Sequence, residues 1–200
     1  MIVDTLNTLR TGFGALWSDL FSTAVCNLLW LVGMLLVIPG PPATAALFYY
    51  GNRKAHGEVS GVGDFFFALK RYWWVGWRWG LVNLVLIAIL WGDYRLTGRL
   101  SQSNWAHFVQ GFYLTALAAW LLVQLYALPF LFEQKNPSVR DALRNSAVML
   151  GRNTGFSVLL GCLLILILAV GFPLFMLSLA GGGVFLAVVG NQAVIRHLVK

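Results

Sequence analysis

Residues 27–50 read NLLWLVGMLLVIPGPPATAALFYY, an apolar run that meets three prolines and then resumes as a second, shorter helical pattern. Pro39, Pro41 and Pro42 lack backbone N–H donors, so a chain that stays at membrane depth here needs protein or water to cover the freed carbonyl groups. The next six residues, GNRKAH, are abruptly polar and basic. The stretch therefore predicts a membrane helix with a kinked or re-entrant end at a positively charged boundary.

The composition extends this prediction to the whole chain. Of 200 residues, 59% are hydrophobic and only 10% are charged, whereas soluble proteins contain about 25% charged residues. The mean hydropathy is +0.76. The net charge of +7 comes from Lys and Arg beside apolar segments, which favours membrane topology over a nucleic-acid partner. Cys26 and Cys162 lie in apolar segments and predict neither a disulfide framework nor a thiol metal site.

The expected fold is an all-α, polytopic membrane helix bundle that forms a single integral membrane domain over residues 1–200. Apolar residues at three- and four-residue steps predict an amphipathic helix over residues 1–20, lying flat on the outer surface or packed across the bundle. Asp64, a candidate N-cap, and Ser138 begin two cytoplasmic interfacial connector helices. About five transmembrane helices are expected, at residues 21–38, 73–91, 109–132, 155–177 and 178–195.

Five spans distribute the basic residues unequally between the two faces of the membrane. One face receives eleven Lys and Arg residues, and the other receives only Arg10, Arg95 and Arg99. The positive-inside rule then places the protein in the bacterial cytoplasmic (inner) membrane, with the N-terminus outside and the C-terminus in the cytoplasm.

The two connectors resemble each other. ALKR at 68–71 precedes GWRWG at 76–80, and ALRN at 142–145 precedes GRNTG at 151–155. Pro129, near the end of the third span, echoes the first proline break. The pattern predicts a parallel repeat of residues 21–91 and 109–177, although any amphipathic helix at a basic interface collects similar residues.

A first set of candidate site residues combines the proline break with amides in separate spans. Such amides can join helices by hydrogen bonds or line a polar path, and the lack of charged residues among them favours the first role. The set comprises Asn27, Trp30, Pro39, Pro41, Pro42, Thr44, Asn83, Gln124, Pro129 and Asn191.

A second set lies on the connectors and could dock a membrane partner or bind lipid headgroups. Its tryptophans could stack on a sugar, but an interfacial aromatic belt is the favoured interpretation. The set comprises Arg53, Lys54, Lys70, Arg71, Trp73, Trp74, Arg78, Arg140, Arg144 and Arg152.

No catalytic arrangement emerges from the sequence. His56 and His107 fall in loops expected on opposite faces, and His197 lies near the end of the chain, so these three histidines do not predict a metal centre. The carboxylates lie near membrane boundaries, and no phosphate-binding loop is present. We expect no enzymatic activity and no cofactor.

Several segments together resemble the YesL-like family of small bacterial integral membrane proteins. They are NLLW at 27–30, PPATAALF at 41–48, DFFFALKRYW at 64–73, LPFLFEQ at 128–134 and ALRNSAVMLGRN at 142–153. PGPPAT at 39–44 departs from the simpler, single-proline pattern that we associate with this family.

The family has no established activity, but the resemblance implies an accessory role beside a binding-protein-dependent carbohydrate importer. The expected partners are therefore the lipid bilayer and other membrane subunits, such as an importer permease or ATPase. A small solute transporter or channel, with a polar path near the proline break, is the alternative.

Overall fold

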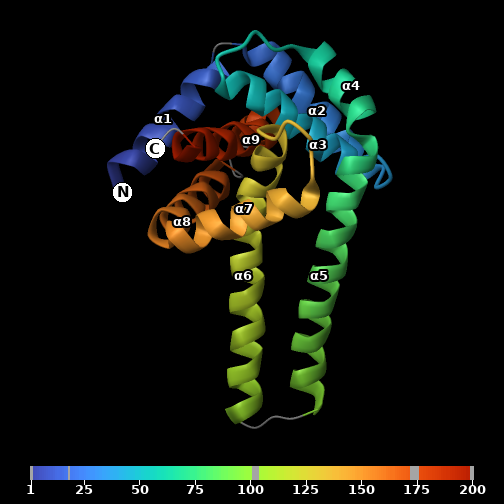
Figure 1. The fold of residues 1–200 in the computed structure, drawn as a ribbon, viewed down its shortest axis with the longest axis vertical. Helices are drawn as coiled ribbons and strands as arrows, with labels where there is room; N and C mark the ends of the chain where they lie inside the picture. Colours follow the sequence, from blue (N-terminus) through green and yellow to red (C-terminus); the bar gives the residue numbers. More distant parts are fainter. Residues whose placement is uncertain (1, 18, 101–103, 172–175, 199–200) are drawn as a thin grey trace.

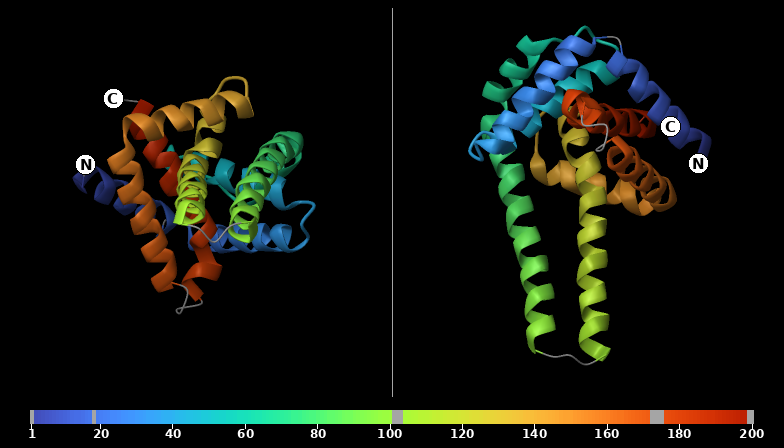
Figure 2. Two further views of the ribbon diagram at one scale, coloured as in Figure 1. Left: turned by 90° about the horizontal axis from the view of Figure 1, so that it is seen from below. Right: turned by 180° about the vertical axis from the view of Figure 1, so that it is seen from behind.

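The computed structural model describes residues 2–17, 19–100, 104–171 and 176–198, which form nine α-helices (Figure 1). The all-α prediction is confirmed. Helices α5 and α6 form a long antiparallel hairpin, and the other seven helices gather at one end of it, in a region that we call the cap (Figures 1 and 2). The helices are α1 Ile2–Trp17, α2 Leu20–Leu35, α3 Gly40–Ala55, α4 Val62–Arg71, α5 Trp73–Leu100, α6 Asn104–Phe132, α7 Val139–Arg152, α8 Thr154–Gly171 and α9 Met176–Leu198.

Two helices are long and apolar enough to cross a membrane, Trp73–Arg99 in α5 and Asn104–Phe132 in α6. Two pairs of consecutive helices are long and apolar enough only when each pair is taken together, and each pair bends sharply at the break between its helices. The bend is 98° between Ile2–Ala15 and Leu20–Leu35, and 102° between Val139–Arg152 and Thr154–Ala169. The described residues thus offer two to four spans. The prediction of a membrane protein is supported, whereas the count of five is not confirmed.

The hairpin is longer than its apolar segments. Residues 93–107, expected to form a polar loop, instead continue α5 to Leu100 and begin α6 at Asn104. Residues 93–100 contain no proline, so nothing in the backbone stops the helix where its side chains become polar. At 28 residues, α5 is about 42 Å long and exceeds a hydrocarbon core of about 30 Å.

The proline break reverses the chain. Helix α2 ends at Leu35, Val37 adopts a left-handed φ of 62°, and α3 begins at Gly40 with proline in its first turn, where no N–H partner is needed. Hydrogen bonds then pair Trp30 with Thr44 and Thr23 with Tyr50, so α3 runs back along α2. The chain therefore reverses at the break and does not continue α2 with a kink.

The last helix is the centre of the cap. Helix α9 packs against α1, α2, α3 and α6, and its side chains Val184, Val188 and Val194 are fully buried. In the left view of Figure 2, α8 and α9 lie crosswise to α5 and α6, which are seen end-on. The segments predicted as the fourth and fifth spans therefore belong to the cap, apart from residues 172–175, which lie outside the described part of the chain.

Helix α1 turns an unexpected face toward the protein. The face packed on α9 carries small and hydroxyl residues, namely Thr5, Thr8 and Gly12, and a Cβ on Gly12 would lie only 2.7 Å from Val189 Cγ2. Of the predicted apolar face, Ile2 and Leu6 are exposed, whereas Leu9 is buried and Phe13 contacts Phe185 of α9. The predicted apolar side of the helix thus faces the protein only in part.

The two ends of the chain lie together at the cap (Figure 1). Arg196 Nη1 donates a hydrogen bond of 3.3 Å to the backbone oxygen of Asp4. A topology with the N-terminus outside and the C-terminus inside would separate these groups by a bilayer of about 30 Å. The contact favours placing α1 and the end of α9 on the same side of the hairpin (Figure 1), and the orientation of the termini in the membrane stays a prediction.

The proposed repeat remains a prediction. In both halves an amphipathic helix precedes an apolar one, α4 before α5 and α7 before α8. The breaks differ, because Pro129 lies inside the continuous helix α6, whereas Pro39 separates α2 from α3.

Asp64 is not the N-cap that the sequence predicts. It lies inside α4, whose N-cap is Gly61, and its carboxylate accepts the Gly61 N–H at 2.8 Å.

Candidate functional site

The prolines of the break rest on glycines of α5. A Cβ on Gly76 would lie 2.7 Å from Pro42 Cα and 3.0 Å from the Pro41 oxygen, and one on Gly80 would lie 2.7 Å from Pro41 Cβ. The G-x-x-x-G spacing therefore lets α3 approach α5 closely. Its counterpart at Gly151 has open space around a Cβ, so the second motif does not repeat this contact there.

Asn27 joins α2 to α9. Its side chain is fully buried, and Oδ1 accepts hydrogen bonds from the backbone N–H groups of Gly183 at 2.9 Å and Val184 at 3.3 Å. Near the break, Trp30 Nε1 donates to Thr44 Oγ1 at 3.0 Å. These predicted residues therefore lie within one packed α2–α3–α9 unit.

Two further amides join the helices of the hairpin. Trp79 Nε1 donates to Gln124 Oε1 at 2.8 Å, and Trp120 Nε1 donates to Asn83 Oδ1 at 3.0 Å. Asn83 also donates to the backbone oxygen of Trp79 at 2.9 Å. Each amide thus pairs with a tryptophan of the opposite helix, an arrangement that suits interhelical packing in an apolar surrounding.

Asn191 is the hub of a polar network at the base of the cap. Its Oδ1 accepts from Asn52 Nδ2 at 3.0 Å, and its Nδ2 donates to the backbone oxygens of Ala187 at 2.8 Å and Phe48 at 3.2 Å. Asn52 Nδ2 also lies 2.6 Å from Glu133 Oε1. The network therefore links α9 to α3 and to the end of α6.

His56 extends the network, with Nε2 2.9 Å from Glu133 Oε1. Glu133 lies far along the chain from the polar segment that contains Asn52 and His56, and none of the three is among the predicted site residues. A helical i, i+4 pattern links Asn52 and His56 within one turn, but the contact of both with Glu133 is visible only in the fold.

Pro129 serves the packing of α9. Because proline has no N–H, the Leu125 carbonyl lacks its helical donor. Gly190 lies against this carbonyl, and a Cβ on Gly190 would be 2.7 Å from the Leu125 oxygen and 3.3 Å from Pro129 Cγ. The proline thus marks a close helix contact within α6, where the sequence suggested a break.

The basic residues predicted for docking divide into paired, buried and exposed ones. Arg53 forms ion pairs with Glu58, at 2.8 Å, and with Asp64, which orders the turn between α3 and α4. Trp73 is half-buried and Trp74 is 74% exposed. The exposed basic residues are Lys70, Arg71, Arg78, Arg140, Arg144 and Arg152.

Lys54 corrects the prediction of a surface role, because it is only 8% exposed. Its Nζ donates to the backbone oxygens of Ala15 at 3.2 Å and Asp19 at 3.4 Å, and to Thr23 Oγ1 at 3.0 Å. The ammonium therefore binds the junction between α1 and α2 from the end of α3. Lys54 lies outside the candidate spans, and burial lowers the pKa of its ammonium below the ordinary value of 10.5.

This pKa shift predicts that Lys54 makes stability rise with pH. Between the lowered folded pKa and 10.5, the unfolded chain binds the Lys54 proton more strongly than the folded one, so the free energy of unfolding increases as pH rises. We expect the difference in Tm between wild type and Lys54→Met to shift in favour of wild type as the pH rises toward 10.5. Lys70→Met, on an exposed position of α4, is the control, and parallel Tm curves for all three proteins would contradict the prediction.

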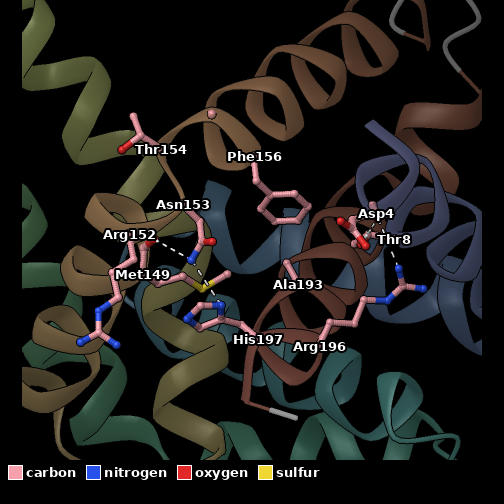
Figure 3. A pocket seen from close by; sticks show the side chains of 11 residues that line it. Asp4, Thr8, Met149, Arg152, Asn153, Thr154, Phe156, Ala193, Arg196 and His197 are labelled. Atoms are coloured by element: carbon pink, nitrogen blue, oxygen red, sulfur yellow. Dashed lines mark hydrogen bonds between the residues drawn. The ribbon is translucent and has the colours of Figure 1, made fainter. Parts of the chain in front are cut away.

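A cavity of about 390 Å³ lies where α7, α8, α9 and α1 meet (Figure 3). In Figure 3, Asn153 and His197 stand on one side, Asp4 and Arg196 stand on the other, and Phe156 lies between them. Asn153 Nδ2 is 3.3 Å from His197 Nδ1. Of the predicted residues, only Arg152 lines this cavity. The others come from both ends of the chain and from residues 149–156, and no sequence pattern indicates that these segments meet.

The described residues form an all-helical protein with two to four segments long and apolar enough to cross a membrane, and its polar side chains mainly join helices. Within it, residues 23–94 match the sequence model of a family described as "Protein of unknown function, DUF624", the family that contains the YesL-like proteins. The matched part includes α3, α4 and the contact of the prolines with Gly76 and Gly80. No curated protein and no solved structure matches the chain.

Proposed function

We propose that the protein is a non-enzymatic accessory or assembly subunit of a membrane complex, anchored by the α5–α6 hairpin. The observation that carries the proposal is the exposed basic face of α7. Arg140, Arg144 and Arg152 are exposed, whereas Ala142 and Met149 on the opposite face are buried. Among the described residues, these three arginines form no ion pair, so their charges are available to a partner.

The distribution of charge supports a cap in the cytoplasm of a bacterium. Apart from Arg95 and Arg99, every Lys and Arg that the structure describes lies in the cap or in the first two turns of α5. The positive-inside rule favours the cytoplasm for that end of the hairpin. Both ends of the chain would then be cytoplasmic, in the inner membrane, and residues near Arg99 would face outward.

The alternative of a solute path along the proline break has less support. Asn27 and Thr44 form hydrogen bonds between helices. Pro41 and Pro42 pack so closely on Gly76 and Gly80 of α5 that neither glycine has room for a Cβ. A path there would require these contacts to open. The contacts are those expected of packing between membrane helices.

The partner that fits the basic face carries an acidic surface next to the membrane, since opposite charges steer such encounters. The resemblance to YesL-like proteins makes the permease or ATPase of a carbohydrate importer the first partner to test. Anionic lipid headgroups are the competing occupant of the same face.

Charge reversal on α7 tests the proposal. We expect full-length Arg140→Glu/Arg144→Glu, extracted from native membranes with a mild detergent, to retain at most about a tenth of the partner that wild type retains, as measured by quantitative mass spectrometry. Glutamate at position 140 lies in the first turn of α7 and is compatible with the helix dipole, so folding is preserved.

Arg95→Glu/Arg99→Glu, at the far end of the hairpin, is the matched control and should retain the partner. Recovery of wild type alone, with no protein enriched over the control preparation, would refute the subunit role. Loss of binding to anionic vesicles with an unchanged set of co-purified proteins would assign the basic face to lipid.

A further inference from the structure

The cavity beside the sharp bend between α7 and α8 has the size and lining of a ligand site. Its volume of about 390 Å³ falls in the range of about 300–1,000 Å³ that small-molecule pockets occupy. Its walls come from four helices, since Asp4 belongs to α1, Met149 to α7, Phe156 to α8 and His197 to α9. Segments distant in sequence thus converge on one space.

The polar groups of the walls are mainly donors. Arg196 uses two of its N–H groups, on the Asp4 backbone oxygen and on Thr11 Oγ1, and a guanidinium has five. On the opposite side (Figure 3), the Asn153 amide nitrogen already lies 3.5 Å from the Met149 backbone oxygen and 3.3 Å from His197 Nδ1. When Nδ1 accepts from Asn153, the Nε2–H of His197 is the remaining donor on that wall. The Arg152 guanidinium also belongs to the lining, although in Figure 3 it extends away from the centre. Donors on two walls suit an oxyanion with several acceptor oxygens.

The charge of the lining selects among oxyanions. On one wall the Arg196 guanidinium lies beside Asp4, whereas the Arg152 guanidinium points away from the centre, so the lining has little surplus positive charge (Figure 3). A dianion such as a phosphate monoester would meet the Asp4 carboxylate with surplus negative charge. A phosphodiester carries a single negative charge, and Phe156 and Met149 offer apolar surface to its substituents.

The place of the cavity in the fold indicates where the phosphodiester comes from. In Figures 1 and 2, α7 and α8 are the part of the cap nearest to the hairpin's far end. Ile165 and Leu166 of α8 are exposed, as expected of a helix at the surface of a bilayer. We propose that the cavity binds a phosphodiester group, with the headgroup of a membrane phospholipid as the principal source. The proposal does not depend on the subunit role.

Gly155 allows a sharp test, because it lines the cavity in the first turn of α8 and is exposed. Gly155→Glu places a carboxylate beside the site, while the helix dipole favours that carboxylate, so the Tm should not fall. Gly155→Gln is the neutral control of the same size. Each full-length protein is delipidated in a maltoside detergent and titrated calorimetrically with dihexanoylphosphatidylcholine, glycerophosphocholine or dihexanoylglycerol.

We expect wild type and Gly155→Gln to bind dihexanoylphosphatidylcholine, and Gly155→Glu to bind it at least about tenfold more weakly, as expected for the loss of a charge-assisted contact. Tighter binding of this lipid than of glycerophosphocholine supports a lipid headgroup, whereas equal binding supports a free phosphodiester. Equal affinity of the Glu and Gln variants, equal binding of dihexanoylglycerol, or no binding of either phosphodiester would overturn the proposal.

Discussion

Gly76→Ala is expected to destabilise the protein by about 1–3 kcal/mol, the usual cost of overpacking a tight contact. The new Cβ would lie 2.7 Å from Pro42 Cα and 3.0 Å from the Pro41 oxygen, which are backbone atoms of a proline pair that cannot readily move aside. The first turn of α3 would have to leave α5. The measurement is the free energy of unfolding of detergent-solubilised protein.

Gly92→Ala is the matched control, because it makes the same change in the same helix where nothing lies within 4 Å of the new atom. Alanine favours helix over glycine by up to about 1 kcal/mol, so this variant should be unchanged or slightly more stable. Opposite signs for the two variants would show that the contact with the prolines matters. Equal effects would mean that α3 does not rest on α5.

Asn191→Leu is expected to cost about 2–3 kcal/mol, because it leaves two polar groups of α3, the Asn52 amide and the Phe48 oxygen, without their partner. Asn52 loses one of its two acceptors, and the Phe48 oxygen loses the Asn191 donor. The result can be checked by the unfolding free energy of the variant beside that of Asn145→Leu. Asn145 is exposed on α7, and the same substitution there should change stability by at most about 0.5 kcal/mol.

A double-mutant cycle isolates the pair at the centre of the network. Adding Asn52→Leu to Asn191→Leu removes the donor that the first change orphaned, so the double variant should lose less than the sum of the two single losses. Strict additivity would indicate that the Asn52–Asn191 hydrogen bond contributes nothing to the folded state.

Much of the local structure follows from the sequence. The apolar runs identify α5 and α6, the amphipathic pattern identifies α4 and α7, and Ser138 is the N-cap of α7, with its Oγ accepting the Asp141 N–H at 3.4 Å. The proline cluster correctly marks a break. These features are local, because each depends on residues within one or two helical turns.

The arrangement of the helices does not follow in the same way. Hydropathy cannot distinguish an apolar face that meets lipid from one that meets protein. Residues 178–195 are therefore predicted as a span, although Val184, Val188 and Val194 of α9 are fully buried in the cap. Prolines predict that a helix ends but not the direction in which the chain continues. A lysine next to a predicted boundary, such as Lys54, gives no sign that the end of α1 will enclose it.

The central position of α9 constrains how the chain matures. A ribosome synthesises α9 after the other eight described helices, and until then α2 and α3 lack the helix to which Asn27 and Asn52 bind. The α5–α6 hairpin can insert into the membrane before the cap forms, while the amides that the cap will bury are still exposed. Any factor that protects the nascent chain must therefore act on an anchored intermediate with an open cap, and the cap can close only after α9 has emerged.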